Sequence, residues 1–266
     1  MSVQSLYTAA TGMDSLQTKL DVIANNLANV NTTGFKKGRA NFEDLFYRNE
    51  RNPGAVDQAG NLTATGTAIG LGSRVSSTQT EQRQGAFQSS GNPLDLAIEG
   101  QGFFQLSDPS GEVRYTRAGN FSLNATGQLV AGSAQTGRLV TPPIQIPANA
   151  TGITVSSEGI VSAQLAGQTS PTQVGTLQLA LFPNPEGLMK HGENLYSQTD
   201  ASGAPTQPNP GTQGVGYVRQ GFLEMSNVEP VQELIDLITT QRSFELNSQA
   251  IQAGDQILQL ISNLRR

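Results

Sequence analysis

The feature that most constrains this fold is an apolar heptad repeat at each end of the chain. Near the N-terminus, apolar residues recur every seven positions in two interleaved series, which is the a/d pattern of a helix that buries one stripe. The pattern predicts a helix from about Ser2 to Thr32, followed by Gly34 where a helix can end. The stripe consists of Leu6, Ala9, Met13, Leu16, Leu20, Ile23, Leu27 and Val30.

A second long helix is predicted near the C-terminus, from about Val231 to Asn263. Ser226 and Glu229 have the spacing of a capping box, and Pro230 suits the first turn of a helix. The apolar stripe of this helix consists of Leu237, Phe244, Ile251 and Leu258, with a looser second series at Leu234, Ile238, Ala250, Ile257, Ile261 and Leu264.

Between the two helices, the apolar period changes from 3.5 to 2. Short stretches of alternating apolar and polar residues are separated by clusters of Gly, Asn and Pro, which is typical of strands joined by tight turns. Residues 73–225 are therefore predicted to be all-β. Residues 47–72 are polar and have no strong period, so by themselves they indicate a linker.

These patterns predict an α+β chain. We expect residues 1–46 and 226–266 to form a terminal helical domain, residues 47–72 an irregular segment, and residues 73–225 a central β domain. Because each helix has a stripe to bury, the simplest arrangement pairs the two as a coiled coil, in one chain or across copies. Only 14% of the residues are charged, so little repulsion opposes association, and the two stripes are predicted to form a polymerisation interface.

The sequence contains no clustered catalytic chemistry. It has no Cys and one His, His191, which excludes a His-containing zinc site or a Cys–His pair. Asp95 and Glu99 would lie about 13 Å apart along a strand, farther than the roughly 5–9.5 Å of a glycosidase pair. We therefore expect no enzyme activity, no catalytic residue, no cofactor and no metal.

Nucleic acids and membranes are not expected partners. The formal net charge is −5, and no basic patch is evident. No stretch approaches the 18 or so apolar residues of a membrane-spanning helix. The first residues lack a basic stretch followed by an apolar run, so no cleaved signal peptide is expected.

The end of the first predicted helix is unusually rich in asparagine, in the stretch ANNLANVNTTGFKK (residues 24–37). An amide donates and accepts at once, so it can satisfy a helix end or pair with another copy without burying a charge. The hypothesis is that Asn25, Asn26, Asn29 and Asn31 make hydrogen bonds between subunits and at the helix terminus; the alternative is ordinary helix-end and turn chemistry.

A small basic run follows the asparagines. Lys36, Lys37 and Arg39 suit the negative end of a helix dipole, and the alternative is a contact with a partner.

The stretch ANNLANVNTTGFKK resembles the signature of the rod and hook family of axial proteins of the bacterial flagellum. Residues 226–258 resemble the C-terminal signature of that family, and IEGQGFFQL and YTRAGNFSLNATGQLV resemble its β core. The resemblance covers nearly the whole chain. The family motif falls on Asn25, Asn26, Asn29, Asn31, Gly34 and Phe35.

The resemblance implies a structural subunit that polymerises into a helical tube and transmits torque from motor to hook. FEDLFYRNERNPGA (residues 42–55) and GENLYSQTDASGAP (residues 192–205) are most similar to members that build the distal rod, and residues 47–66 match a segment thought to keep that rod stiff. The implied partners are other copies of the chain, proximal rod proteins, the hook protein and the P- and L-ring proteins around the rod. The implied location is the basal body, across the periplasm.

Two alternatives stay open from the sequence. One is another axial protein of the flagellum, in the proximal rod or the hook. The other is a surface adhesin with a coiled-coil stalk and a β-rich head, which would be a small fixed oligomer.

Overall fold

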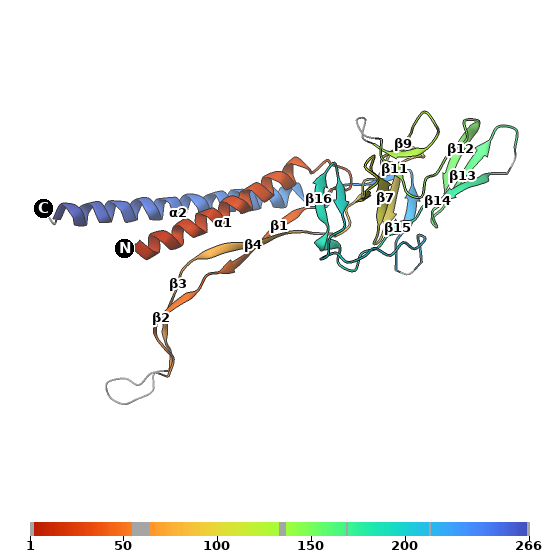
Figure 1. Ribbon diagram of the computed structural model, residues 1–266. Helices are drawn as coiled ribbons and strands as arrows, with labels where there is room; N and C mark the ends of the chain where they lie inside the picture. Colours follow the sequence, from red (N-terminus) through yellow and green to blue (C-terminus); the bar gives the residue numbers. More distant parts are fainter. Residues whose placement is uncertain (1–2, 55–63, 133–136, 169, 213, 265–266) are drawn as a thin grey trace. The chain divides into compact units, whose positions relative to one another are not determined.

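The computed structural model describes residues 3–54, 64–132, 137–168, 170–212 and 214–264 (Figure 1). The chain forms two compact units. The helix–ribbon unit comprises residues 1–28, 38–80 and 229–266, and the β unit comprises residues 29–37 and 81–228. The chain therefore passes from one unit to the other four times.

The helix–ribbon unit contains both long helices and a two-stranded ribbon. The helices are antiparallel, because Asn26 near the end of one bonds Glu233 near the start of the other. Figure 1 shows the two helices side by side, and the ribbon strands β1 and β4 pack on α1. The elements are α1 (Val3–Ala28), β1 (Gly38–Asp44), β2 (Tyr47–Arg51), β3 (Thr67–Gly70), β4 (Ser73–Thr80) and α2 (Pro230–Leu264), with β1 paired to β4 and β2 to β3, both antiparallel.

The helix α1 ends four residues before the predicted Thr32. A turn closes there instead, because the backbone N–H of Thr32 donates to the carbonyl oxygen of Asn29 at 3.1 Å, and the Thr32 hydroxyl donates to the Asn29 side chain at 3.1 Å. Short polar side chains compete with the helix for backbone groups in this way.

The prediction of a coiled coil is wrong. The chain has one helix at each end, separated in sequence by the strands, and two such helices are not evidence of a coiled coil. Most of the stripe positions are only half buried, and Leu258 is exposed. A heptad period shows that a helix buries one side, but not what covers it, and α1 divides its contacts between a helix and a ribbon. The buried positions are largely small or polar: Ser15, Ile23 and Asn26 on α1, and Glu233, Thr240 and Gly254 on α2.

Two strands of the ribbon, β2 and β3, lie in the segment that was interpreted as irregular. All five residues of β2 are exposed, so neither side of this strand selects apolar residues and no period of two arises. Residues 55–63 of this segment lie outside the described residues.

The prediction of a central all-β region is confirmed, with one short 3₁₀ turn (Pro185–Gly187) among the strands. The largest sheet has the order β16-β17-β8-β7-β11-β10-β9, with β15 also paired to β7. A three-stranded sheet has the order β12-β13-β14, and two further pairs are β18–β6 and β19–β5. The strands are β5 (Phe87–Ser89), β6 (Leu96–Glu99), β7 (Phe103–Ser107), β8 (Val113–Thr116), β9 (Phe121–Leu123), β10 (Leu129–Ala131), β11 (Leu139–Val140), β12 (Ala150–Val155), β13 (Ile160–Leu165), β14 (Thr172–Thr176), β15 (Leu179–Ala180), β16 (Met189–Gly192), β17 (Leu195–Ser197), β18 (Tyr217–Gln220) and β19 (Phe222–Glu224).

Two apolar clusters hold the β unit together. The larger is built on aliphatic residues with Phe104, which is fully buried, and Phe121. The smaller is mainly aromatic: Phe103 meets Phe182 and Tyr196 edge to face, with ring centroids 5.9 and 5.7 Å apart. Burial raises the pKa of Tyr196 to about 12.

This shift predicts an alkaline loss of stability. The unfolded phenol loses its proton near pH 10, whereas the folded one keeps it until about pH 12, so stability is complete below pH 10 and falls as the pH rises through this window. The loss is about 2–3 kcal/mol. Tyr196→Phe has no such proton and should lose less stability between pH 10 and 12, measured by urea unfolding at several pH values. Equal slopes for both proteins would contradict the assignment.

Candidate functional site

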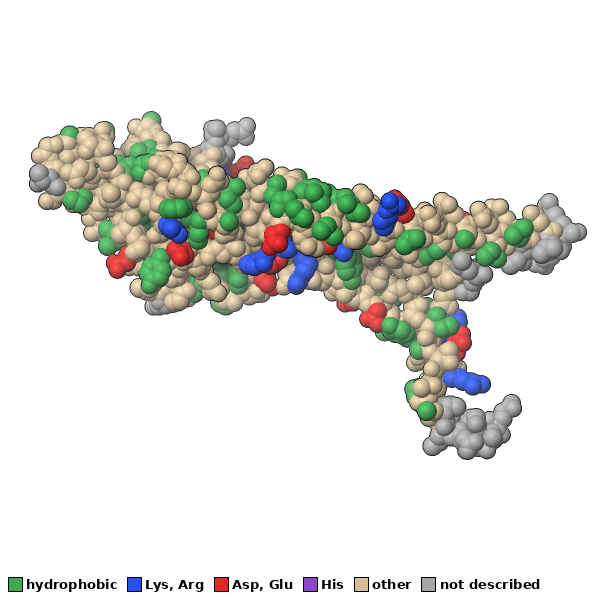
Figure 2. Space-filling model, turned by 180° about the vertical axis from the view of Figure 1, so that it is seen from behind, with side chains coloured by type: hydrophobic (Ala, Val, Ile, Leu, Met, Phe, Trp, Pro, Cys, Tyr) green, Lys and Arg blue, Asp and Glu red, His purple; other side chains and the backbone are tan. Residues whose placement is uncertain are grey.

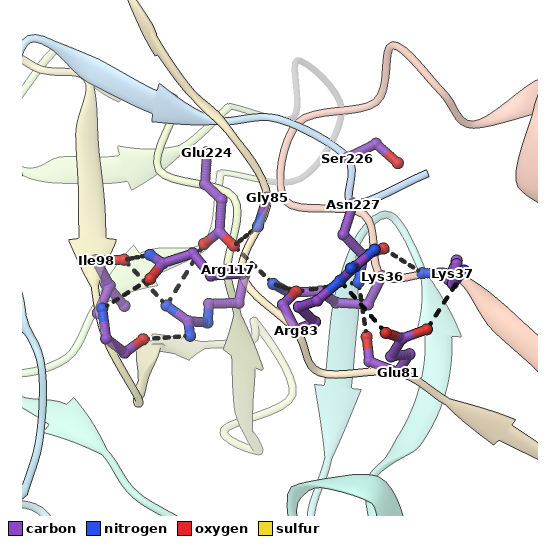
Figure 3. Close-up of polar contacts among 12 residues, drawn as sticks. Lys36, Lys37, Glu81, Arg83, Gly85, Ile98, Arg117, Glu224, Ser226 and Asn227 are labelled. Carbon is purple, nitrogen blue, oxygen red and sulfur yellow. Dashed lines mark hydrogen bonds and ion pairs between the residues drawn. The ribbon is translucent and has the colours of Figure 1, made fainter. Parts of the chain in front are cut away.

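A buried polar junction holds three distant segments of the chain together within the β unit. The segments are residues 34–37, which follow α1, residues 81–85, which follow β4, and residues 224–227, which precede α2 (Figure 3). Each is the stretch by which the chain enters or leaves the β unit. The junction therefore brings the segment after the N-terminal helix next to the segment before the C-terminal helix.

The centre of the junction is an ion pair without solvent access. The Lys36 ammonium lies 2.6 Å from Glu224 Oε1, and both side chains are 0% exposed. Lys36 Nζ also donates to the carbonyl oxygen of Arg83 at 2.8 Å, and the backbone N–H of Gly85 donates to Glu224 Oε1 at 3.0 Å. Burial lowers the pKa of Lys36, and the Glu224 carboxylate opposes that shift.

A second buried cation flanks the same carboxylate. Arg117 Nη1 lies 3.5 Å from Glu224 Oε2, and the guanidinium donates to the carbonyl oxygens of Ile98 and Gly100. It also lies over the Phe103 ring, 5.6 Å from the centroid. Burial lowers the pKa of Arg117, against the attraction of Glu224. One carboxylate thus balances two buried cations.

Asn227 extends the junction. Its Oδ1 accepts from the backbone N–H of Lys37 at 2.8 Å, and its Nδ2 donates to the carbonyl oxygens of Glu81 and Arg83. One side chain therefore satisfies backbone groups of both other segments. Next to it, the backbone N–H of Gly34 donates to the Glu224 carbonyl oxygen at 2.7 Å.

The second half of the asparagine-rich motif belongs to the β unit. Gly34 has φ +68°, a backbone conformation that favours glycine. A Cβ at this position would also lie only 2.6 Å from the backbone nitrogen of Ala118. The ring of Phe35 lies under the Lys190 ammonium, 5.3 Å from the centroid. Gly34 and Phe35 therefore contact their own chain.

The first half of the motif lies in the helix–ribbon unit. Buried Asn26 exchanges two hydrogen bonds with the backbone of Gly38, at 2.9 and 2.8 Å, and donates to Glu233 Oε2 at 3.2 Å. It ties α1 to both β1 and α2. Asn29 and Asn31 already belong to the β unit, where Asn29 makes the turn described above. Asn25 and Asn31 are exposed. Contacts of these asparagines with other subunits stay a prediction.

Sequence reasoning missed most of the junction. Lys36 was interpreted as a solvated helix-end charge or a partner contact, but it is completely buried. Glu224, Arg117 and Asn227 were not singled out, because a charge at a strand end is normally solvated and the sequence does not show which cation will meet it. The lone His191 is exposed and contacts Ser197 and Arg114.

The α2 stripe turns toward α1. At 3.6 residues per turn, Leu237, Phe244 and Ile251 share the side of α2 on which Glu233 bonds α1, and all three are half buried. On α1, Ile23 is buried, and the other stripe positions of that helix are half buried.

The opposite side of α2 is also apolar. We call this the outer face, and it consists of Val231, Leu234, Ile235, Ile238, Leu246 and Leu260, which are 45–71% exposed. Of these, only Leu234 and Ile238 belong to the looser second series of the heptad pattern. A helix with apolar residues on two opposite sides is typical of one that is covered on both.

The described residues hold no group of His and acidic side chains that could bind a metal ion. None of the described helices has the length and hydropathy needed to cross a membrane.

Helices that keep apolar side chains in solvent are typical of a protein that assembles with others. Comparison with known proteins gives the family. The profile of "Flagella basal body rod protein" matches residues 6–36, that of "Flagellar hook protein FlgE/F/G D1 domain" residues 97–163, and that of "Flagellar basal body rod FlgEFG protein C-terminal" residues 219–264.

Full-length relatives agree. The chain is 47% identical to the flagellar basal-body rod protein FlgG of Caulobacter vibrioides over 99% of this chain and 100% of the relative. It is 43% identical to FlgG of Buchnera aphidicola subsp. Baizongia pistaciae over 98% and 100%, and 42% identical to FlgG of Bacillus subtilis over 99% and 100%. The chain belongs to the flagellar basal-body rod and hook family, and it is a structural rod subunit of the basal body.

The charge balance of the junction predicts which substitutions lower the free energy of unfolding most. Glu224→Gln leaves two buried cations without a carboxylate and should cost about 3–5 kcal/mol of unfolding free energy. Lys36→Met leaves the Arg117–Glu224 pair and should cost less. Lys37→Met is the control, because its pair with Glu81 is partly exposed and should contribute about 1 kcal/mol or less. Urea unfolding measures all three, and a larger loss for Lys36→Met than for Glu224→Gln would contradict this account.

The close approach at Gly34 can be separated from its backbone conformation. Gly34→Ala and Gly91→Ala both place a side chain at positive φ, +68° and +71°, but only Gly34 has backbone atoms against the new Cβ. Positive φ costs each variant about 1–2 kcal/mol, and the clash should add about 1–3 kcal/mol at Gly34 alone. Equal losses of stability in the two variants, measured by thermal or urea unfolding, would show that a Cβ at Gly34 does not clash with the neighbouring backbone.

Proposed function

We propose that the chain is a subunit of the distal rod, polymerising into a rigid helical tube that crosses the periplasm and transmits torque from motor to hook. The observation that supports this most directly is its end-to-end similarity to proteins named FlgG. Stiffness in such a tube comes from many buried contacts in each subunit, and the buried ties of the junction supply rigid segments for it.

The proposed partners follow from position in the same assembly. Other copies of the chain form the tube, proximal rod proteins and the hook protein continue it at its two ends, and the P- and L-ring proteins surround it. Membership of the rod and hook family supports assembly with rod and hook components in general, and the individual partners are part of the proposal.

The heptad stripes are proposed to act between copies as well as within the chain. Most of these side chains are half buried in the single chain, so each keeps some surface for a neighbouring subunit. The proposed interface comprises Leu6, Ala9, Met13, Leu16, Leu20, Ile23 and Leu27 of α1, Val30 in the turn after it, and Leu237, Phe244, Ile251 and Leu258 of α2.

Electron microscopy of the concentrated full-length chain tests the proposal. We expect straight tubes from the wild-type chain. Leu20→Ala should cost about 2–5 kcal/mol in each subunit where this residue is buried, and should abolish tubes while the β unit keeps its circular dichroism and unfolding transition. Gln17→Ala, at an exposed position of the same helix, is the control.

The other outcomes discriminate between assemblies. Curved tubes would indicate a hook-like subunit, and normal straight tubes from Leu20→Ala would show that the stripe is not an interface. A discrete small oligomer that does not extend even when isolated rod is added as a template would contradict the rod assignment.

A further inference from the structure

A hollow in the β unit lies outside the buried junction, beside the three-stranded sheet β12-β13-β14. Its volume is about 390 Å³, within the roughly 300–1,000 Å³ of small-molecule sites. Its walls come from the turn between β12 and β13, the sheet itself, the loop of residues 209–212 and Tyr217 at the start of β18. All of its lining residues belong to the β unit. Neither the junction nor the proposed polymer interface explains this hollow.

Close contacts of two glycines preform the walls. Gly159, in the turn between β12 and β13, faces the loop, and a Cβ on it would lie 2.8 Å from Cγ of Pro210. Gly211, in the loop, faces an aromatic ring, and a Cβ on it would lie 2.6 Å from Cε1 of Tyr217. A side chain at either position would push the walls apart, so both approaches require glycine. Walls that are already in place reduce the ordering cost of binding a ligand.

The side chains of the hollow combine an aromatic ring with polar groups. Tyr217 is 53% exposed, so part of its surface is open to a ligand. Glu158 and Asn209 are exposed, and neither side chain has a hydrogen bond or ion pair with any residue that the structure describes. The Gln173 amide donates to Thr176 Oγ1 at 3.3 Å. The hollow therefore presents one carboxylate and two amides, which between them both accept and donate.

Charge is sparse around the hollow. Glu158 is the only charged residue between positions 150 and 176, and positions 201–218 contain none. Figure 2 shows one face of this end of the β unit, on the left, where uncharged side chains dominate. One exposed carboxylate attracts a cation by about 1 kcal/mol or less, a calcium ion takes six to eight oxygen ligands, and an anion would be repelled. A neutral ligand fits this surface best.

We infer that the hollow binds a neutral saccharide. The C–H side of a pyranose ring packs against an aromatic ring such as that of Tyr217. Each sugar hydroxyl donates and accepts, so it matches both the Glu158 carboxylate and the Asn209 amide. An arginine side chain of a partner protein would also suit a ring and a carboxylate, but it has five donors and no acceptor, which leaves the amide N–H groups unmatched. The inference goes beyond the proposed function, because saccharide binding does not depend on tube formation.

Saturation-transfer NMR with triacetylchitotriose, a neutral trisaccharide, tests the inference. The method observes the sugar, so it uses the full-length chain whether this is monomeric or assembled. The wild-type chain should transfer saturation to the sugar protons, and titration gives the Kd. Tyr217→Ala should weaken binding about tenfold, because it removes the stacking ring. Asn209→Ala should weaken it about threefold or more, because it removes an amide that donates and accepts.

Two matched variants serve as controls. Tyr217→Phe keeps the ring and should keep most of the affinity. Tyr47→Ala removes a tyrosine that is 56% exposed in the helix–ribbon unit, and it should bind the sugar as the wild type does. Circular dichroism and urea unfolding check that each variant folds. If Tyr217→Ala is unfolded, Asn209→Ala carries the test, because this exposed side chain has no partner among the described residues whose loss would unfold the chain.

Each outcome decides the nature of the hollow. No transfer of saturation to the sugar from the wild-type chain would overturn the inference, and so would an affinity that Tyr217→Ala and Asn209→Ala both leave unchanged. Binding of acetyl-arginine amide that Glu158→Gln abolishes, without binding of the trisaccharide, would also overturn it and would indicate a basic protein partner. The rod assignment is tested separately by electron microscopy of tubes, so its failure and the failure of this inference are distinguishable.

Discussion

The fold depends on how one buried carboxylate is satisfied. Glu224 has no solvent access, so its charge has to be balanced inside the β unit, and Lys36 and Arg117 do so from segments far apart in the sequence. Removing a charge from water is unfavourable unless it is paired and hydrogen-bonded. The pair therefore forms only when residues 34–37 and 224–227 lie together. Folding of the β unit thus requires these two distant segments to meet.

Asn26 plays a comparable role in the helix–ribbon unit. Three hydrogen bonds from one buried amide join α1 to β1 and α2. A buried amide tolerates few arrangements, because any shift leaves a donor or acceptor unpaired. Apolar stripes alone would let the helices slide past one another by a turn. The polar contact fixes their register, and this explains an asparagine in the midst of a heptad pattern.

The sequence predicted what depends on periodicity and missed what depends on tertiary pairing. Both helices and the all-β centre follow from periods of 3.5 and 2, which each segment carries by itself. The prediction of a coiled coil was wrong because an apolar stripe does not show which element packs against it. Several buried positions of α1 and α2 are also polar. Lys36 was missed because its burial depends on Glu224, 188 residues later. The outer face of α2 was partly visible as a looser second series, but only the structure shows that it points away from α1.

These contacts divide into two kinds that suit two different tasks. Inside the chain, apolar clusters supply the core, and charged or amide hydrogen bonds with strict geometry add ties between distant segments. On the surface, the outer face of α2 leaves apolar side chains exposed. Apolar contacts are non-directional and roughly proportional to area, so they can be repeated along a polymer without a charge to desolvate. The polar pairs therefore help to fix the geometry of the subunit, and the exposed apolar side chains leave surface for contacts with other molecules.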